Sequence, residues 1–262
     1  MTVELNFPKL KTIFLLSLFC FLGDSCKDDD SIPEPFEDFV SDFYSNTSSL
    51  EIIIGYETNA EPYISYGGRD AWDVTLNNIQ NLLKDKNITV SGPKKLNKMT
   101  DFGVLEQKSY SRQNILDLAK DLQVYSNKDS AKGITIVFLD GYYIRDGEIL
   151  DQVLGLNIGN TSVLAIFKPV IDASSSSKAE QTLVEQSTVT HEIGHALGLV
   201  NNGVRATSAH HDVANGSHCT NTECVMYWMN GAGDISKFIT PFLTGNDVTL
   251  FGNQCIEDVK AK

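Results

Sequence analysis

The 262-residue chain has few prolines and cysteines and a deficit of positive charge. Its 7 prolines, its 19 glycines and the lack of a repeat period exclude collagen-like, low-complexity and solenoid architectures. Five cysteines in this length do not make a disulfide-stapled scaffold. Lys and Arg number 21 against 34 Asp and Glu, so the net charge is −13. A surface of this sign repels phosphate, and nucleic acid is therefore not an expected partner.

The N-terminal region has an apolar run, but a short one. Lys9 and Lys11 precede the run at 13–22, which is too short to cross a bilayer as a helix and has the length of a signal-peptide core. Small residues then lead to Cys26, and this segment resembles a bacterial lipobox, with Asp24 as a departure. The resemblance implies lipidation of Cys26. The alternative is an ordinary secretory signal.

We expect residues 1–25 to be a signal peptide and residues 26–49 to be a lipidated, acidic tether. Pro33 and Pro35 interrupt the tether, as is typical of linkers. The Lys-Asp-Asp-Asp run at 27–30 resembles the surface-export signal of lipoproteins in some Gram-negative bacteria. The resemblance implies an exported lipoprotein of the outer membrane, exposed at the cell surface and bound to the membrane through its lipid anchor.

Residues 50–262 alternate apolar strands with amphipathic helices, which predicts an α/β domain with a mixed sheet. The run at 133–139 is almost continuously apolar and is expected to be central and buried. The other expected strands are at 51–54, 88–90, 154–158 and 163–167, the last two joined by a turn at Gly159-Asn160. The expected helices are one capped by Asp70, with Trp72, Leu76, Ile79 and Leu83 on its apolar face, one that begins at Ser111, and one at 247–258.

All five histidines of the chain lie between residues 191 and 218. This clustering predicts a metal site, because histidines of an ordinary core have no reason to gather in one segment. The first two belong to the sequence His191-Glu192-Ile193-Gly194-His195. Upstream, Ser177-Lys178-Ala179-Glu180 is a capping-box sequence, which predicts that a helix begins there and carries the motif.

His191 and His195 are one turn apart, so both imidazoles project from one face of the helix and can bind one Zn²⁺. Glu192 projects beside the metal without binding it. It is the expected general base for a metal-activated water.

The motif continues to Gly198, and His-Glu-x-x-His-x-x-Gly resembles the metzincin metallopeptidases, in which the glycine ends the helix with a sharp turn. In that family a third histidine follows three residues later. Asn201 occupies this position here, and a neutral amide oxygen is a poor zinc ligand. The third ligand must come from another part of the chain.

The segment from His218 through Cys219 and Cys224 to Met226 resembles the HC-x4-C-x-M segment of archaemetzincins. The resemblance implies that His218 is the third ligand and that Met226 forms the Met-turn below the metal. His210 remains the alternative third ligand. The implied fold is a metzincin-like α/β (α+β) domain. Its mixed twisted sheet, backing helices and active-site helix form an upper subdomain (about 50–198), and an irregular lower subdomain follows (about 199–262).

Archaemetzincins also bind a second zinc through four cysteines, two of them in a downstream CxxC. This sequence has no CxxC, so a single zinc ion is expected. Cys219 and Cys224 are then free to pair with each other, or one of them with Cys255. The resemblance further implies that 163–167 is an antiparallel edge strand to which a substrate adds. The alternative is an ordinary core strand.

The expected function is that of a zinc metallopeptidase, an endopeptidase, whose partner is a peptide or protein substrate. Zn²⁺ polarises the scissile carbonyl, and Glu192 takes the proton of the attacking water. The alternative is a non-catalytic, surface-anchored binding protein on a degenerate metzincin fold. Asn201 and the insertion at 199–217 favour this second hypothesis, whereas the intact Glu192 favours the first.

Overall fold

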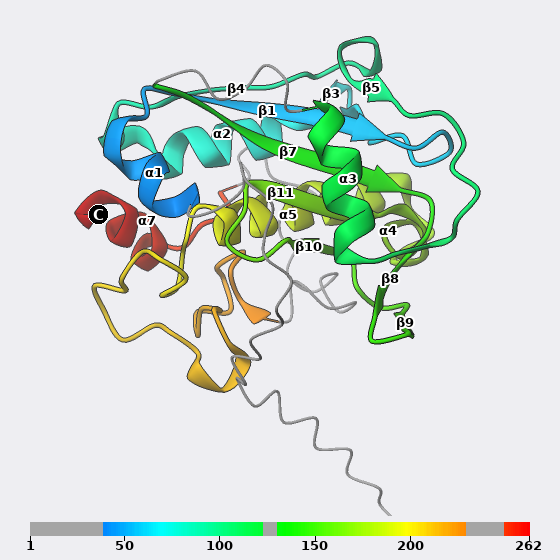
Figure 1. The fold of residues 1–262 in the computed structure, drawn as a ribbon. Coiled ribbons are helices and arrows are strands. Elements are labelled where there is room, and N and C mark those ends of the chain that lie inside the picture. The colour runs from blue at the N-terminus through cyan, green and yellow to red at the C-terminus, as the bar shows by residue number, and fades with distance from the viewer. Residues whose placement is uncertain (1–38, 123–129, 229–248) are drawn as a thin grey trace, which may run out of the picture.

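The structure, a computed structural model, describes residues 39–122, 130–228 and 249–262 (Figure 1). Its central sheet has six strands in the order β10-β11-β7-β1-β4, with β5 also paired to β1. The strands are β1 (Ser49–Tyr56), β4 (Thr89–Ser91), β5 (Thr100–Asp101), β7 (Ala131–Leu139), β10 (Gly155–Asn157) and β11 (Val163–Phe167). All pairs are parallel except β10–β11, so the α/β class with a mixed sheet is confirmed.

The centre of the sheet is β7, as its continuous apolar run predicts. It is parallel to β1 on one side and to β11 on the other, and every residue from Gly133 to Leu139 is buried. Such a strand needs helices on both faces of the sheet to exclude water. The apolar sequence of β7 therefore already requires the layered arrangement that Figure 1 shows.

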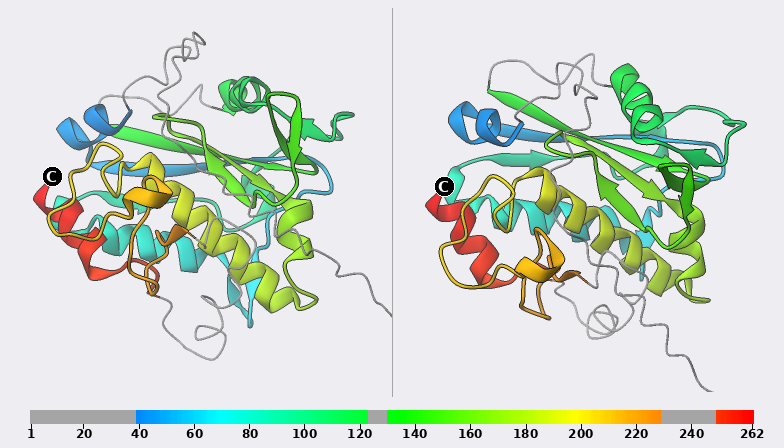
Figure 2. Two further views of the ribbon diagram at one scale, coloured as in Figure 1. Left: turned by 90° about the horizontal axis from the view of Figure 1, so that it is seen from below. Right: turned by 60° about the horizontal axis from the view of Figure 1, so that its bottom comes forward.

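Helix α3 (Arg112–Leu122) covers one face of the sheet, and α2 (Trp72–Leu82) and α5 (Lys178–Ala196) lie together on the other (Figure 2). The short α4 (Lys168–Ala173) leads from β11 into α5. The predicted apolar face of α2 is buried, but its expected cap is wrong. Asp70 belongs to the strand β3 (Arg69–Asp70), and Ala71, which precedes the helix, makes no side-chain cap bond.

The hairpin of β10 and β11 corrects one implication of the resemblance. Strand β11 is entirely buried between β7 and β10, parallel to β7, so it is a core strand and not the edge. The antiparallel edge strand of the described sheet is β10. Gly159 turns the chain between them at a φ of 58°, a backbone conformation that favours glycine.

The two ends of the described chain also differ from expectation. Helix α1 (Phe39–Asn46) lies within the segment expected as a tether, yet Phe39, Val40 and Phe43 are buried, so the folded part begins before residue 50. The acidic composition of the segment concealed this short apolar face. Helix α7 spans Asn253–Ala261 instead of 247–258, since Gly252 at its start has an extended backbone. Residues 1–38, with the signal peptide and Cys26, lie outside the described residues.

A small sheet that no sequence pattern predicted stands beside the central one. It consists of β6 (Ser109–Tyr110), β8 (Tyr142–Arg145) and β9 (Glu148–Leu150), and a two-stranded ribbon joins β2 (Ser65–Tyr66) to β3. Within the described part of the chain, the helices are too short or too polar for any of them to cross a membrane.

Candidate metal centre

Helix α5 carries the first two histidines and begins at the predicted position. Ser177 is its N-cap, and the side chain accepts a hydrogen bond from the backbone N–H of Glu180. The helix is buried along most of its length, because α2 and the strands β10 and β11 pack against it. It ends at Ala196, and Gly198 then turns the chain at a φ of 81°. A Cβ added at Gly198 would also lie 2.7 Å from Val40 Cγ1 of α1. Both the backbone conformation and the close packing therefore require glycine at this turn.

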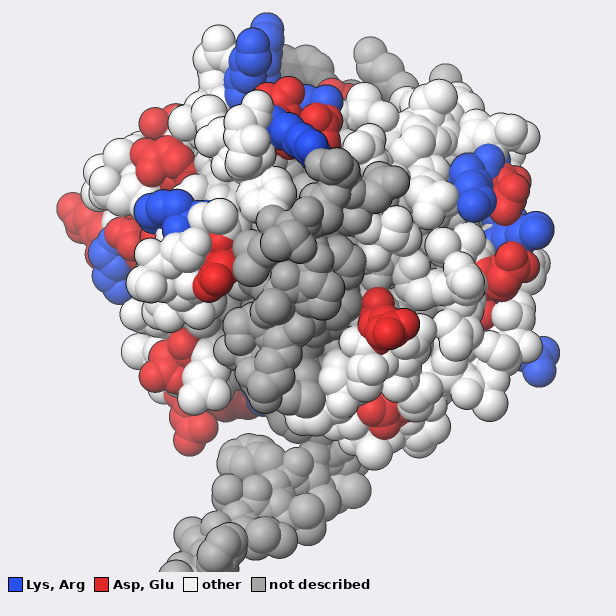
Figure 3. Space-filling model, turned by 180° about the vertical axis from the view of Figure 1, so that it is seen from behind, with Lys and Arg blue, Asp and Glu red and all other residues white. Residues whose placement is uncertain are grey.

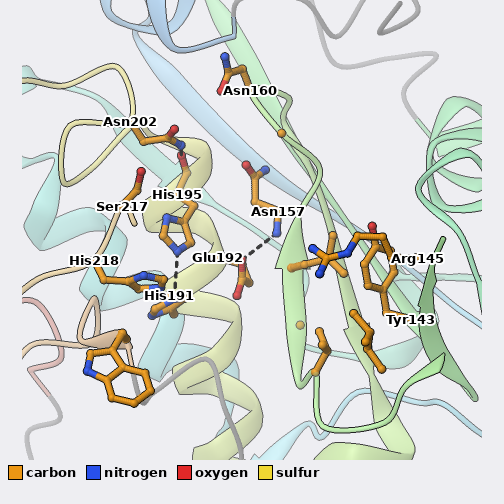
Figure 4. A pocket seen from close by; sticks show the side chains of 16 residues that line it. Tyr143, Arg145, Asn157, Asn160, His191, Glu192, His195, Asn202, Ser217 and His218 are labelled. Atoms are coloured by element: carbon orange, nitrogen blue, oxygen red, sulfur yellow. Dashed lines mark hydrogen bonds between the residues drawn. The ribbon is translucent and has the colours of Figure 1, made fainter. Parts of the chain in front are cut away.

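Three histidines converge at the C-terminal end of α5 (Figure 4). The Nε2 atoms of His191 and His195 are 3.0 Å apart. The ring centroid of His218 lies 5.3 Å from the ring centroid of His191 and 5.0 Å from that of His195. One ring nitrogen from each of the three lies within 4.8 Å of the others. The structure thus brings together the predicted ligand set.

Hydrogen bonds to backbone carbonyls leave the Nε2 atoms of two of these rings available for a metal. The Nδ1–H of His191 donates to the Val225 carbonyl at 2.6 Å, and the Nδ1–H of His218 donates to the Asn215 carbonyl at 2.6 Å. Such contacts are typical of zinc-binding histidines, since they fix the tautomer and the ring orientation. Tetrahedral zinc at about 2.0–2.1 Å from nitrogen places its ligand atoms about 3.3 Å apart, so the ring positions fit this ion.

The three imidazoles are also in the chemical form that binds metal. Burial, with the neighbouring His218, lowers the pKa of His191 to about 3. Burial and the two other histidines lower the pKa of His195 well below its usual value, and burial lowers that of His218. All three rings are therefore neutral at neutral pH, with lone pairs free for a cation.

Glu192 lies beside the histidines without sharing in their cluster. Its Oε2 accepts a hydrogen bond from the backbone N–H of Asn157 in β10 at 2.7 Å, which holds the carboxyl group between the helix and the edge strand (Figure 4). Burial raises the pKa of Glu192 to about 8, and the bond from Asn157 opposes this rise. A carboxyl group whose pKa lies near neutrality is suited to accept and release a proton.

Met226 lies directly below the helix at Gly194. An added Cβ on Gly194 would be 2.4 Å from the Met226 sulfur, and Met226 is fully buried. The Met226 carbonyl accepts a hydrogen bond from the N–H of Cys219 at 2.7 Å. The carbonyl of Val225, the preceding residue, accepts a hydrogen bond from the His191 ring, so the turn at Met226 lies against the histidines of α5.

A cavity of about 540 Å³ opens onto the histidines and Glu192. Edge strand β10 and the small sheet form its opposite wall, where Figure 4 shows Tyr143 and Arg145. Trp228, which follows the Met-turn, lines it as well. The edge strand next to a buried carboxyl group and a histidine cluster can hold an extended chain against these groups.

The alternative third ligand, His210, and Asn201, which occupies the family's usual ligand position, both have other partners. Both ring nitrogens of His210 have other neighbours, Cys219 Sγ at 3.2 Å and Asp258 Oδ2 at 2.7 Å. Asn201 is in contact with His211, its Nδ2 lying 2.9 Å from His211 Nδ1. The structure therefore places His218, and not His210, with the two helical histidines.

A second cluster was missed by sequence reasoning. His210, Cys219 and Cys255 offer ligand atoms that all lie within 4.8 Å of one another, and the Sγ atoms of Cys224 and Cys255 are 3.6 Å apart. Cys219, Cys224 and Cys255 form no disulfide with one another, so neither expected pairing is present. The missing CxxC made a second metal site unexpected, and no sequence signal linked His210 to the cysteines.

No family model matches the chain, and its similarities to known proteins include the following two. The chain is 30% identical to an archaemetzincin of Saccharolobus solfataricus over 138 residues. This match includes 50% of the chain and spans 60% of the length of the archaemetzincin. A solved structure, a zinc-dependent peptidase from Methanocorpusculum labreanum, is 12% identical with a TM-score of 0.44 and covers 79% of this chain and 99% of its own.

Proposed function

We propose that this protein is a zinc-dependent metallopeptidase, and that it cleaves within peptide chains. The observation that carries the proposal is the convergence of three neutral imidazoles beside a buried carboxyl group that does not belong to their ligand set. The similarity to an archaemetzincin supports it. A purely structural metal site has no need of a carboxyl group in this position.

In the proposed reaction, His191, His195 and His218 would hold zinc, which would polarise the scissile carbonyl and make water more acidic. Glu192 takes the proton of the attacking water. Because its Oε2 is occupied by the Asn157 N–H, Oε1 is the atom free to receive that proton. The same carboxyl group then passes the proton to the leaving amine.

The edge strand β10 is the proposed place for the substrate backbone. An extended peptide that pairs with β10 would pass Glu192 and the three histidines, because the backbone of Asn157 in that strand already contacts Glu192. This geometry favours cleavage inside a chain over removal of terminal residues.

The test is Glu192→Gln in the full chain. The variant should retain zinc and lose about 10²–10⁴-fold in peptide cleavage, the usual contribution of a general base. Glu51→Gln, at an exposed position of β1, is the matched control and should cleave normally. Cleavage by Glu192→Gln at the rate of the parent would refute the mechanism. Bound zinc without turnover of a broad peptide library by the parent would instead support a non-catalytic binding protein.

We further propose that the chain is exported, lipidated at Cys26 and held at the outer membrane, with its folded part facing outward. Support comes from the sequence of the first 30 residues. Labelled palmitate should enter the wild-type protein and not Cys26→Ser, and equal labelling of both would refute lipidation there. On the face in Figure 3, basic side chains stand among acidic ones, so this face does not have the basic surface typical of nucleic-acid-binding proteins.

A further inference from the structure

The hairpin of β8 and β9 places an arginine at the cavity that opens onto the histidines. Asp146 and Gly147 form the turn of the hairpin at φ values of 53° and 80°, the tight connection that a twisted hairpin favours. Tyr143 and Arg145 are two positions apart on β8, so their side chains lie on the same face of the hairpin, and both line the cavity. Among the described residues around this cavity, Arg145 is the one arginine or lysine.

The edge strand β10 divides the cavity into two sides. Gly155 faces helix α5, because a Cβ added there would lie 2.9 Å from Thr188 Cγ2. The side chain of Leu156, the next residue, therefore points to the opposite side, where the hairpin of β8 and β9 lies. Figure 4 shows Arg145 on that side, across Asn157 from the histidines. The side chains of a peptide paired with β10 would alternate between the same two sides.

The side away from α5 combines apolar surface with positive charge. Tyr143 packs against Phe167 of β11, with the ring centroids 6.1 Å apart, and Leu150 is opposite Tyr143 in the register of the hairpin. Burial raises the pKa of the Tyr143 hydroxyl, and the charges of Arg145 and Arg112 oppose this rise. Both guanidinium groups therefore act on the same wall of the cavity.

This local charge is opposite in sign to that of the whole chain. The net charge of −13 repels acidic peptides at long range, so a preference for them needs a local source. Arg112, at the start of α3, adds to that source, since its Nη2 would lie 3.2 Å from a Cβ added at Gly159 on the cavity. The planar guanidinium group of Arg145 matches the geometry of a carboxylate. Glu148, opposite Arg145 in the hairpin, is exposed and is the carboxylate that a substrate would compete with.

We propose that Arg145 determines specificity, and that it favours substrates with an aspartate or glutamate whose side chain points away from α5. The inference rests on the proposed function, because it places the substrate along β10. The carboxylate would bind the guanidinium group of Arg145, and the carbon chain that carries it would lie against Tyr143 and Leu150. Acidic residues at the neighbouring substrate positions would face α5, and they would not reach the arginine.

The first experiment measures the binding of short alanine peptides that end in a hydroxamate, a group that chelates zinc and so fixes the register of the peptide. One glutamate occupies each position in turn, and a matched peptide carries glutamine there. The affinity for the wild-type full chain is measured by fluorescence anisotropy. Glutamate should bind about 3–10-fold more tightly than glutamine at one position or at alternate positions, between the values of an exposed ion pair and a bidentate one. Equal affinities at every position, or a gain at two adjacent positions, would overturn the proposal.

The second experiment repeats the measurement with charge variants. Arg145→Gln should bring the glutamate and glutamine peptides to equal affinity, and Glu148→Gln should increase the preference for glutamate because it removes the competing carboxylate. The matched control, Arg205→Gln, removes the same charge from an exposed position in the loop after α5 that lines a different cavity, and it should keep the wild-type preference. A preference that survives Arg145→Gln would refute the assignment.

The outcomes separate this inference from the proposed peptidase activity. Tight binding of the glutamine peptides without a gain from glutamate would refute the role of Arg145 and leave the zinc centre intact. If no hydroxamate peptide binds, the zinc centre and the inference both fail. Since binding is measured without turnover, a protein that binds with the expected preference but cleaves nothing would support the role of Arg145 and refute only the peptidase.

Discussion

Gly194→Ala tests the contact between helix α5 and the turn at Met226. The new methyl group would lie 2.4 Å from the Met226 sulfur and 3.3 Å from Leu199 Cδ1. The buried thioether must therefore move by more than 1 Å to reach the ordinary contact distance of about 3.5–4.0 Å. Overpacking of this kind costs about 1–3 kcal/mol, and the better helix propensity of alanine returns about 1 kcal/mol. We expect a net loss of about 0–2 kcal/mol.

The matched background is Met226→Ala, which by itself should cost about 2–5 kcal/mol through the cavity it creates. With the thioether removed, the methyl group at 194 has room, and Gly194→Ala should now stabilise the protein by about 1 kcal/mol. Gly194→Ala is thus expected to lower the stability of the wild-type protein and to raise the stability of the Met226→Ala protein. The expected coupling between the two sites is about 1–3 kcal/mol.

The assay is urea unfolding of all four proteins at one fixed concentration of free zinc, because bound metal contributes to the measured stability. Zinc competition on the same proteins should show weaker binding for Gly194→Ala, since Val225 beside Met226 holds His191. If Gly194→Ala stabilises both backgrounds by the same amount, the packing of Met226 below the helix is wrong.

The remaining predictions concern stability. In the metal-free protein, the raised pKa of Glu192, about 8, means that the folded state keeps this proton longer than the unfolded state. Stability relative to Glu192→Gln should therefore fall by roughly 2–5 kcal/mol between pH 4.5 and 8, and parallel pH curves would contradict this. Phe43→Ala should cost about 3–5 kcal/mol in urea unfolding because the side chain is buried. Asp42→Ala, on the same helix, should cost less than about 1 kcal/mol. Equal losses of stability in the two variants would contradict the packing of α1 against the core. Lys168 and Glu185 form a buried ion pair at 2.5 Å, so Lys168→Met should cost about 3–5 kcal/mol and the added Glu185→Leu should restore most of it; additive losses would refute the pairing.

The features that the sequence predicts well are those that depend on neighbours along the chain. The cap at Ser177 lies within the first turn of α5, and the spacing of His191 and His195 depends only on helix geometry. The buried position of β7 follows from its own apolar run. The position of His218 next to the two helical histidines agrees with what the resemblance of a local motif implied.

The features that were missed depend on contacts between distant segments. His210 meets Cys255 across 45 positions of sequence, and no local pattern links these two residues. The edge position of β10 is decided by which strand pairs with β7, which the apolar residues of β10 and β11 do not specify. Helix α1 is short and lies in an otherwise polar, acidic segment. Only its packing against the loop after α5, where Tyr44 donates to the Leu197 carbonyl, shows that it belongs to the domain.

Anomalous diffraction at the zinc absorption edge, from crystals of the full chain, measures the main centre most directly. We expect a zinc peak about 2.0–2.1 Å from the ring nitrogens of His191, His195 and His218, with Glu192 next to it and not bound. A map without a peak among these three rings, or with His210 in place of His218, would contradict the proposed catalytic site.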